Sequence, residues 1–154
     1  MTPRPDDRAR ELPRVGDPLP EHVTESVDAE KMKTMALLLR DPNPIHWDVG
    51  SVRELGMGDR PVNQGPNNMA YLVGMLAAYA GGFDLVRSLR VRFLSNVFAG
   101  DRLVAGGEVT AVDETTGEVS CDVWLRRDGN ADDVVMAGTA TVLRSALGTG
   151  DRPS

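Results

Sequence analysis

The chain has 154 residues, of which 41% are hydrophobic and 26% are charged, and its formal net charge is −6. This length is typical of one domain, and the composition is that of an ordinary globular protein. No run of about 18 apolar residues is present, so no membrane span is predicted. Lys and Arg are dispersed through an acidic chain, which argues against nucleic acid as a partner.

The cysteine and histidine content further narrows the class of protein. Cys121 is the only cysteine, which excludes an intrachain disulfide framework and is typical of a reducing compartment. One cysteine and two histidines leave little material for a metal site, and none is predicted. Residues 1–14 lack the apolar segment of a secretory signal. We therefore expect a cytoplasmic protein with one domain over residues 15–144, flanked by mobile extensions at residues 1–14 and 145–154.

The first predicted elements are a short strand over residues 22–27 and a helix that Asp28 caps. The helix carries one apolar stripe at i, i+3, i+4 and i+7, which we expect to pack in the core: Met32, Met35, Ala36 and Leu39. Pro42 ends this helix, because the residue before a proline is pushed out of the helical region. Asp48 is placed to cap a second short helix that stops at Gly56.

A longer helix is predicted from Pro66 to Ala80, closed by Gly81 and Gly82. Proline at the first helical position and glycine just past the end is the usual arrangement. The helix has no charged residue and is apolar nearly all round, which is typical of a buried helix. At about 15 residues it is too short to span a bilayer, so we expect it at the centre of the fold.

Strand-like segments follow this helix without another helix between them, over residues 85–95, 102–113, 118–127 and 134–143. Cys121 belongs to the apolar set that alternates with polar residues in the third segment, so its thiol is predicted to be buried. Gly106 and Gly107 indicate a bulge or a close backbone approach. The predicted class is α+β: an antiparallel sheet wrapped around the long central helix, with a helical insertion over residues 28–56 before it.

The segment "RDPNPIHWD", Arg40–Asp48, is the first candidate for chemistry. Asp41 follows a helix C-terminus, where the helix dipole disfavours negative charge. Pro42 and Pro44 stiffen the segment, and a carboxylate and the His46 imidazole held on one water need such stiffness for acid–base chemistry. The alternative is a plain turn, since Asp-Pro and Asn-Pro are common turn formers.

Three further features lie outside that segment. Gly65 stands at the N-terminus of the apolar helix, where its N–H would be a donor for an oxygen that gains negative charge, or it only permits a tight turn. The basic cluster Arg87, Arg90 and Arg92 either meets an anionic ligand or is simply solvated. Trp47 either lines a pocket or packs.

Taken together, "RDPNPIHWD" and the later glycine resemble the D-x-N-P-x-H signature and oxyanion segment of the MaoC-like, hydratase-2 group of hotdog-fold proteins, the (R)-specific enoyl-CoA hydratases and their dehydratase relatives. The resemblance extends over about residues 15–143. Its other segments are "VGDPLP", "LRVRFLSNVFAGDRLVAGGEVTAV" and "VMAGTATV".

The resemblance implies a hotdog domain that hydrates a 2-enoyl thioester or runs the reverse dehydration. Asp41 and His46 would be the catalytic pair, Gly65 the oxyanion donor and Asn43 the residue that orders the loop. The substrate would be an acyl-CoA or an acyl-carrier thioester, and no separate cofactor is implied. A homodimer or higher assembly is expected, with a heteromer as the alternative.

The sequence departs from the family pattern close to this site. Arg40 stands where glycine is common, Gln64 where histidine is frequent, and Asn67 and Asn68 where apolar residues are usual. We therefore assign Gln64, Asn67 and Trp47, with Asn43, to substrate binding or site ordering. Two other functions stay open. A hotdog thioesterase is disfavoured because residues 66–80 have no carboxylate. For a non-catalytic acyl-binding subunit, the altered segment 64–68 is an argument in favour, and the intact Asp41 and His46 are an argument against.

Overall fold

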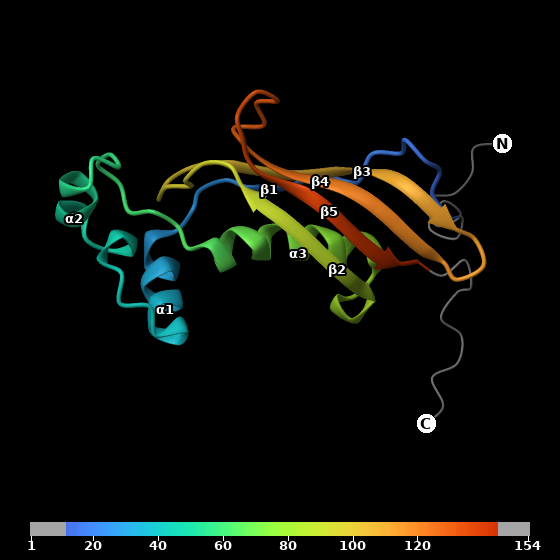
Figure 1. Ribbon diagram of the computed structural model, residues 1–154, viewed down its shortest axis with the longest axis horizontal. Coiled ribbons are helices and arrows are strands. Elements are labelled where there is room, and N and C mark those ends of the chain that lie inside the picture. The colour runs from blue at the N-terminus through green and yellow to red at the C-terminus, as the bar shows by residue number, and fades with distance from the viewer. Residues whose placement is uncertain (1–11, 145–154) are drawn as a thin grey trace.

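The computed structural model describes residues 12–144. The expected extensions over residues 1–14 and 145–154 fall outside that range, apart from residues 12–14. An antiparallel sheet curls over one long helix, and the shorter helices stand beyond one end of that pair (Figure 1). The predicted α+β arrangement, with its helical insertion ahead of the central helix, is confirmed.

The sheet has five strands in the order β1-β3-β4-β5-β2, and every pair of neighbours is antiparallel. All four strand segments that were expected after the central helix are present, with ends that differ by at most two residues. The strand bounds are β1 His22–Thr24, β2 Val86–Phe93, β3 Leu103–Asp113, β4 Glu118–Arg127 and β5 Val134–Leu143. β1 is shorter than the predicted segment 22–27, because Val27 has already turned inward to bond Asp101 across a loop.

The core lies between the inner face of the sheet and the central helix α3, Gly65–Ala80. Along β4 the alternate residues are buried, as the period-2 pattern predicted. Cys121 is 1% exposed and is a free thiol. Burial raises the pKa of that thiol to about 11, which keeps it protonated and unreactive in the folded protein.

α3 begins one residue earlier than expected and ends as predicted, with Gly81 in the left-handed region at φ 99°. Only part of its circumference is covered, which corrects the expectation of a fully buried helix. The sheet covers the side that carries Leu72, Met75 and Leu76, whereas Ala70 and Ala78 are exposed. The apolar residues of α3 therefore pack against the sheet on one face of the helix, and the opposite face is exposed in the single chain.

The insertion consists of helix α1 (Ala29–Leu39), the 3-10 turn η1 (Pro44–His46) and helix α2 (Val49–Glu54). Asp28 caps α1 and Asp48 caps α2, as predicted. The predicted apolar stripe of α1 is only half right. Met32 and Ala36 are buried, but Leu39 is 45% exposed, because α1 extends past the end of the sheet and has no second layer there (Figure 1).

The glycine pair in β3 marks a close approach rather than a bulge. A Cβ added at Gly106 would lie 2.6 Å from the Trp124 indole nitrogen, so the indole covers the backbone at this point. The Arg126 guanidinium lies over the same ring, 4.4 Å from its centroid. Trp124 therefore packs on the outer face of the sheet. The irregularity in the β3–β4 ladder lies further on, between Val109 and Ala111.

Between residues 12 and 144, no helix has both the length and the apolar character needed to cross a bilayer.

Candidate active site

The segment after α1 is held by a series of side chains that bind backbone N–H groups two residues ahead. Asp41 Oδ1 accepts from Asn43 N at 3.0 Å, and Asn43 Oδ1 accepts from Ile45 N at 3.3 Å. Pro44 occupies the first position of η1, where its missing N–H costs nothing. Residues 41–44 therefore have few alternative conformations, and the turn η1 holds His46 in one position.

Arg40 ends α1 in the left-handed region, at φ 52° and ψ 40°. The helix closes around it, since the Asp41 N–H bonds the Ala36 carbonyl at 2.9 Å. This is the position in a helix end that glycine usually fills, because other residues are strained there. The finding gives a physical reason for the glycine that is common at this position in the family, and it places a strained residue directly before Asp41.

Asp41 and His46 are brought together. His46 Nε2 lies 3.1 Å from Asp41 Oδ2, and the imidazole is 8% exposed while the Asp41 side chain is 29% exposed. The other ring nitrogen, Nδ1, lies 2.6 Å from the Val62 carbonyl oxygen. The imidazole is thus held at both nitrogens, with the carboxylate on the side nearer to solvent.

These contacts fix where protons can be. A carbonyl oxygen can only accept, so Nδ1 must carry its hydrogen and donate to Val62. With a hydrogen on Nδ1, Nε2 is the ring nitrogen left to exchange a proton with a water molecule, and it lies beside the Asp41 carboxylate. Such a pair can take a proton from a water molecule and return one to a neighbouring carbon.

The Val62 carbonyl is positioned by a short ladder with the segment after β2. Val62 and Phe98 form an isolated bridge, and Asn63 N bonds Val97 O at 2.7 Å. Asp101 holds that segment in place, because its buried carboxylate accepts from Phe98 N at 3.0 Å and pairs with two arginines. Arg60 lies at 2.7 Å and Arg127 at 2.9 Å. The imidazole is thus indirectly tied to an ionic network near the start of β3.

Burial by itself would raise the pKa of Asp101. The hydrogen bond from Phe98 N–H and those from Arg127 and Arg60 outweigh burial and hold the pKa of this carboxyl below its ordinary value. Asp101 is therefore ionised at neutral pH, and its network is intact there.

Gly65 is the first residue of α3, so its N–H has no acceptor within the helix. It lies three residues after Val62, which places it within about 10 Å of the carbonyl that holds His46. A Cβ added at Gly65 would come 3.2 Å from the Phe93 ring, which is 53% exposed at the end of β2. The glycine thus allows an aromatic ring to lie against the start of the helix.

Gln64 and Asn67 do not point into an open site; they form an amide cluster with Asn63 and Asn68. Gln64 is 2% exposed and donates to the Met32 carbonyl in α1 at 2.8 Å. Asn67 donates to Gln64 Oε1 and Asn63 Oδ1, and Asn63 donates to Asn68 Oδ1. The departures from the family pattern therefore build one buried network that joins α1 to the start of α3.

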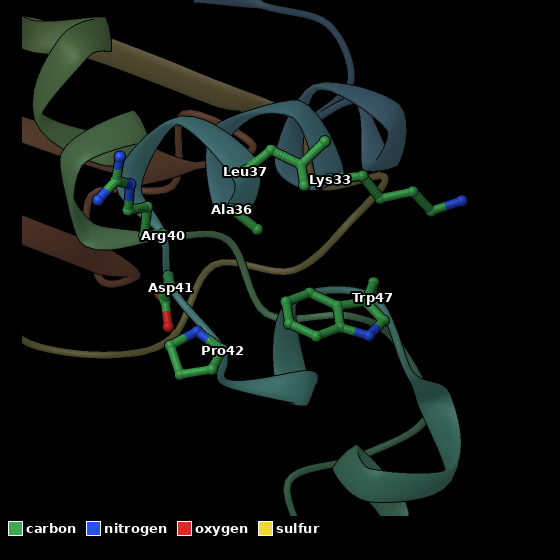
Figure 2. A pocket seen from close by; sticks show the side chains of 7 residues that line it. All are labelled: Lys33, Ala36, Leu37, Arg40, Asp41, Pro42 and Trp47. Carbon is green, nitrogen blue, oxygen red and sulfur yellow. The ribbon is translucent and has the colours of Figure 1, made fainter.

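A cavity with a volume of about 520 Å³ borders Asp41. Figure 2 shows Trp47 on one side of it and Lys33 and Leu37 of α1 on the other. Trp47 is 38% exposed and lines this cavity, which is the first of the two alternatives that the sequence left open. His46 and Gly65 are not among the lining residues. Of the three predicted catalytic residues, only Asp41 thus borders this cavity.

Several residues that position the candidate site could not be identified from the sequence. Val62 acts through its backbone carbonyl, and no residue pattern reports that. Phe93 and Asn63 become relevant only through contacts across long stretches of chain. Among residues 12–144, no group of three or more Asp, Glu, His and Cys side chains is arranged to hold a metal ion.

Comparison with known proteins gives a consistent family and fold. The profile of the family described as MaoC-like domain matches residues 12–126. A search of curated proteins found no match. Among solved structures, the (R)-hydratase from A. caviae involved in PHA biosynthesis is 23% identical, with a TM-score of 0.74. The match covers 85% of this chain and 96% of that chain.

Two other solved structures extend the comparison. A MaoC-like dehydratase is 26% identical with a TM-score of 0.75, and the match covers 86% of this chain but 41% of that longer one. A chain of the ChsH1-ChsH2 complex from Mycobacterium tuberculosis is 23% identical with a TM-score of 0.71. That match covers 85% of this chain and 98% of the other. The shared architecture confirms the predicted hotdog fold.

Proposed function

Since the chain belongs to the MaoC-like domain family, we propose that it is a hydro-lyase that adds water to a 2-enoyl thioester or removes it from a 3-hydroxyacyl thioester. The observation that carries the proposal is the contact between Asp41 and His46, which places a carboxylate and an imidazole side by side at a partly exposed position. An (R)-specific enoyl-CoA hydratase or a 3-hydroxyacyl dehydratase is the activity that this pair supports best.

The proposed reaction uses one water molecule held by Asp41 and His46. One of the two residues takes a proton from the water as its oxygen attacks C3 of the enoyl group. The pair then returns a proton to C2 on the same face, so that the protein ends with its original proton count. The Gly65 N–H is assigned to the thioester oxygen, which gains negative charge as the enolate forms. Because the dipole of α3 points at the same place, negative charge is favoured there.

The substrate is proposed to be an acyl-CoA or an acyl-carrier thioester, with no further cofactor and with the reaction in the cytoplasm. Trp47 is assigned to substrate binding, because it faces the cavity beside Asp41 (Figure 2). Asn43 is assigned to ordering of the loop through its bond to Ile45 N. Gln64 and Asn67 are assigned to ordering of the start of α3.

One observation favours a second candidate function, a non-catalytic acyl-binding subunit of a heteromeric hydratase. Asp41 borders the cavity beside Trp47 whereas His46 and Gly65 do not, and a partner subunit that completes the site would account for this. The thioesterase alternative has less support, because α3 offers no carboxylate to activate water.

The test is a panel of short, long and ring-bearing 2-enoyl-CoAs, with loss of the conjugated enoyl absorbance as the readout. We expect turnover by the wild type and a loss of about 10³-fold or more in kcat for Asp41→Asn and for His46→Ala. Asp48→Asn is the matched control, because Asp48 lies in the same loop but only caps α2. It should retain activity within a few-fold, since asparagine is an equally good cap.

Thermal unfolding of each variant shows whether the chain still folds. If Asp41→Asn keeps full activity, the proposed acid–base pair is wrong. If no substrate in the panel is turned over by the pure wild-type chain, the subunit function replaces the self-sufficient hydratase.

A further inference from the structure

The cavity beside Trp47 has walls that are almost wholly apolar. Leu37 of α1 lies on one side and the Trp47 ring lies on the other. Lys33 and Arg40 also border the cavity, but Figure 2 shows their charged ends directed away from the space between α1 and Trp47. The Lys33 ammonium is paired with Glu30 of the same helix at 2.7 Å. A ligand in this cavity therefore meets apolar surface, including the aliphatic stems of the two cations.

The two large side chains that face each other across the cavity are not covered in the single chain. Leu37 is 80% exposed and Trp47 is 38% exposed. Leu38, the next residue along α1, is also exposed, at 74%, but it does not line the cavity. An apolar group that enters between Leu37 and Trp47 removes both from water, which is favourable. These two residues are therefore placed to hold an apolar ligand, and Leu38 provides a comparison outside the cavity.

The order of groups beside the cavity matches the order of atoms in a 2-enoyl thioester. The Gly65 N–H, assigned to the thioester oxygen on C1, follows closely after Val62, whose carbonyl holds His46. His46 contacts Asp41, and Asp41 borders the cavity. With C1 at Gly65 and the water for C3 at His46 and Asp41, the acyl chain from C4 onward extends toward the cavity.

The volume of the cavity indicates an acyl group longer than four carbons. At about 30 Å³ for each water-sized group, its volume of about 520 Å³ corresponds to about 17 such groups. A four-carbon acyl group has a single carbon beyond C3 and would leave most of this space to water. A longer chain, or a ring, would fill a large part of it.

We infer that the cavity between α1 and Trp47 receives the part of the acyl group beyond C3, and that it favours an uncharged apolar acyl group of about eight or more carbons. Leu37 and Trp47 set this preference. A carboxylate at the far end of the acyl group would lose its water without gaining a partner, so such substrates should bind weakly. The inference deepens the proposed function and rests on it, because it takes a thioester as the substrate.

The first measurement is the binding of saturated acyl-CoAs, which have no double bond to hydrate, to the purified full chain by isothermal titration calorimetry. Each methylene that the cavity covers should tighten binding about 4-fold. Octanoyl-CoA has four more methylenes than butyryl-CoA, so it should bind at least about 30-fold more tightly. The eight-carbon CoA thioester with a terminal carboxylate should bind no more tightly than butyryl-CoA, because its charged end would have to leave water.

Leu37→Asp and Leu38→Asp are a matched pair of variants. Both place the same charge at an exposed position near the end of α1, so their effects on folding and on the anionic CoA moiety should be alike. Leu37→Asp should reduce the preference for octanoyl-CoA over butyryl-CoA to within about 3-fold, whereas Leu38→Asp should keep it. Trp47→Ala should lower the preference at least about 5-fold. Thermal unfolding checks that each variant folds, and Leu37→Ala, with the same expected loss as Trp47→Ala, replaces the aspartate variant if it does not.

The second measurement is turnover of 2-butenoyl-CoA and 2-octenoyl-CoA. The ratio of kcat/KM for the longer substrate to kcat/KM for the shorter one should fall at least about 10-fold in Leu37→Asp. The same ratio should be unchanged in Leu38→Asp. A change in the ratio reports the fit of the acyl group, because loss of the acid–base pair would lower both values together.

Two results would overturn the inference. One is a wild type that binds octanoyl-CoA no more tightly than butyryl-CoA, absence of binding to both included. The other is a chain-length preference that Leu37→Asp and Trp47→Ala both leave intact, which would place the acyl group elsewhere on the protein. Failure of the proposed reaction gives a different pattern, in which no enoyl-CoA is turned over while binding still tightens with chain length and depends on Leu37. That pattern would support the cavity as an acyl site in a non-catalytic subunit.

Discussion

The two halves of the candidate site are held in different ways. The loop from Asp41 to His46 is fixed by neighbours in the chain: prolines, side chains that cap nearby backbone groups, and a strained helix end. The segment from Asn63 to Asn68 is fixed by residues far away in the chain, through buried amides that reach Met32 and through a ladder to Val97. Local constraint suits the half that must keep a carboxylate near solvent. Long-range constraint suits the half that must stay rigid at the core.

This difference predicts which property a substitution in each half affects first. A substitution in the loop should change activity with little effect on folding, because its residues 42–44 are exposed and only His46 is buried. A substitution around Asn63–Asn68 should lower the free energy of unfolding first. The Val62 carbonyl connects the halves, so whatever holds Val62 affects both.

The largest effect on stability is expected for Asp101→Asn. The substitution removes a buried charge from between Arg60 and Arg127, and it should lower the free energy of unfolding by about 3 kcal/mol. Urea unfolding measures this loss. Because Val62 is held through the same segment, kcat should also fall, and the comparison of halves would weaken if stability fell with no change in kcat.

The pH dependence of Asp101 gives a second readout of the same change. Its pKa is held below the ordinary value, so its contribution to stability is complete above about pH 4 and is lost as the pH falls through the folded-state pKa. The stability difference between wild type and Asp101→Asn should therefore shrink as the pH is lowered below about 4. A constant difference down to acid unfolding would contradict the assignment of the ion pairs.

A smaller loss is expected for Gln64→Leu. It removes the hydrogen bonds that Gln64 makes with the Met32 carbonyl and with Asn67 in a buried place, and it should cost about 2 kcal/mol in the free energy of unfolding. Asn43→Ala is the matched comparison from the loop half, since it also removes one amide but from an exposed position. It should cost about 1 kcal/mol or less. Equal losses in urea unfolding would erase the distinction between the two halves.

The smallest effect is a gain. Arg40→Gly should raise the free energy of unfolding by about 0.5–1 kcal/mol, because glycine adopts φ 52° without strain. Lys33→Gly on the same helix is a contrasting control that should destabilise by about 1 kcal/mol. A loss of stability in Arg40→Gly would show that the arginine side chain compensates for its backbone strain.

Much of the fold could be predicted because its signals are local. Asp28 and Asp48 as caps, Gly81 as the end of α3 and the alternation around Cys121 all depend on residues within a few positions. The prediction was wrong where the burial of a side chain depends on a further layer of structure packed against it. Leu39 follows the apolar period of α1, yet it is exposed because nothing in the single chain lies beside it.

The candidate site shows the same division between local contacts, which the sequence indicated, and long-range contacts, which it did not. The meeting of Asp41 and His46 follows from a short, stiff loop, and the contact at 3.1 Å agrees with that expectation. Gln64 and Asn67 were assigned near the site, but no residue pattern indicated that their amides bond to α1 and to each other. Contacts of Met32 with Gln64 and of Phe93 with Gly65 span about 30 residues each, and a single sequence contains no record of such pairings.

Cys121 offers a way to watch the molecule open. Its thiol is shut between β4 and α3 at 1% exposure, so a thiol reagent can reach it only when the sheet separates from the helix. The rate of labelling then reports how often that separation occurs, in the wild-type chain and without an introduced probe. Because it is the chain's only cysteine, every labelled molecule records the same event. The labelling rate of Cys121 thus measures how often the core opens, and a change in that rate would show the effect of a bound ligand or partner subunit.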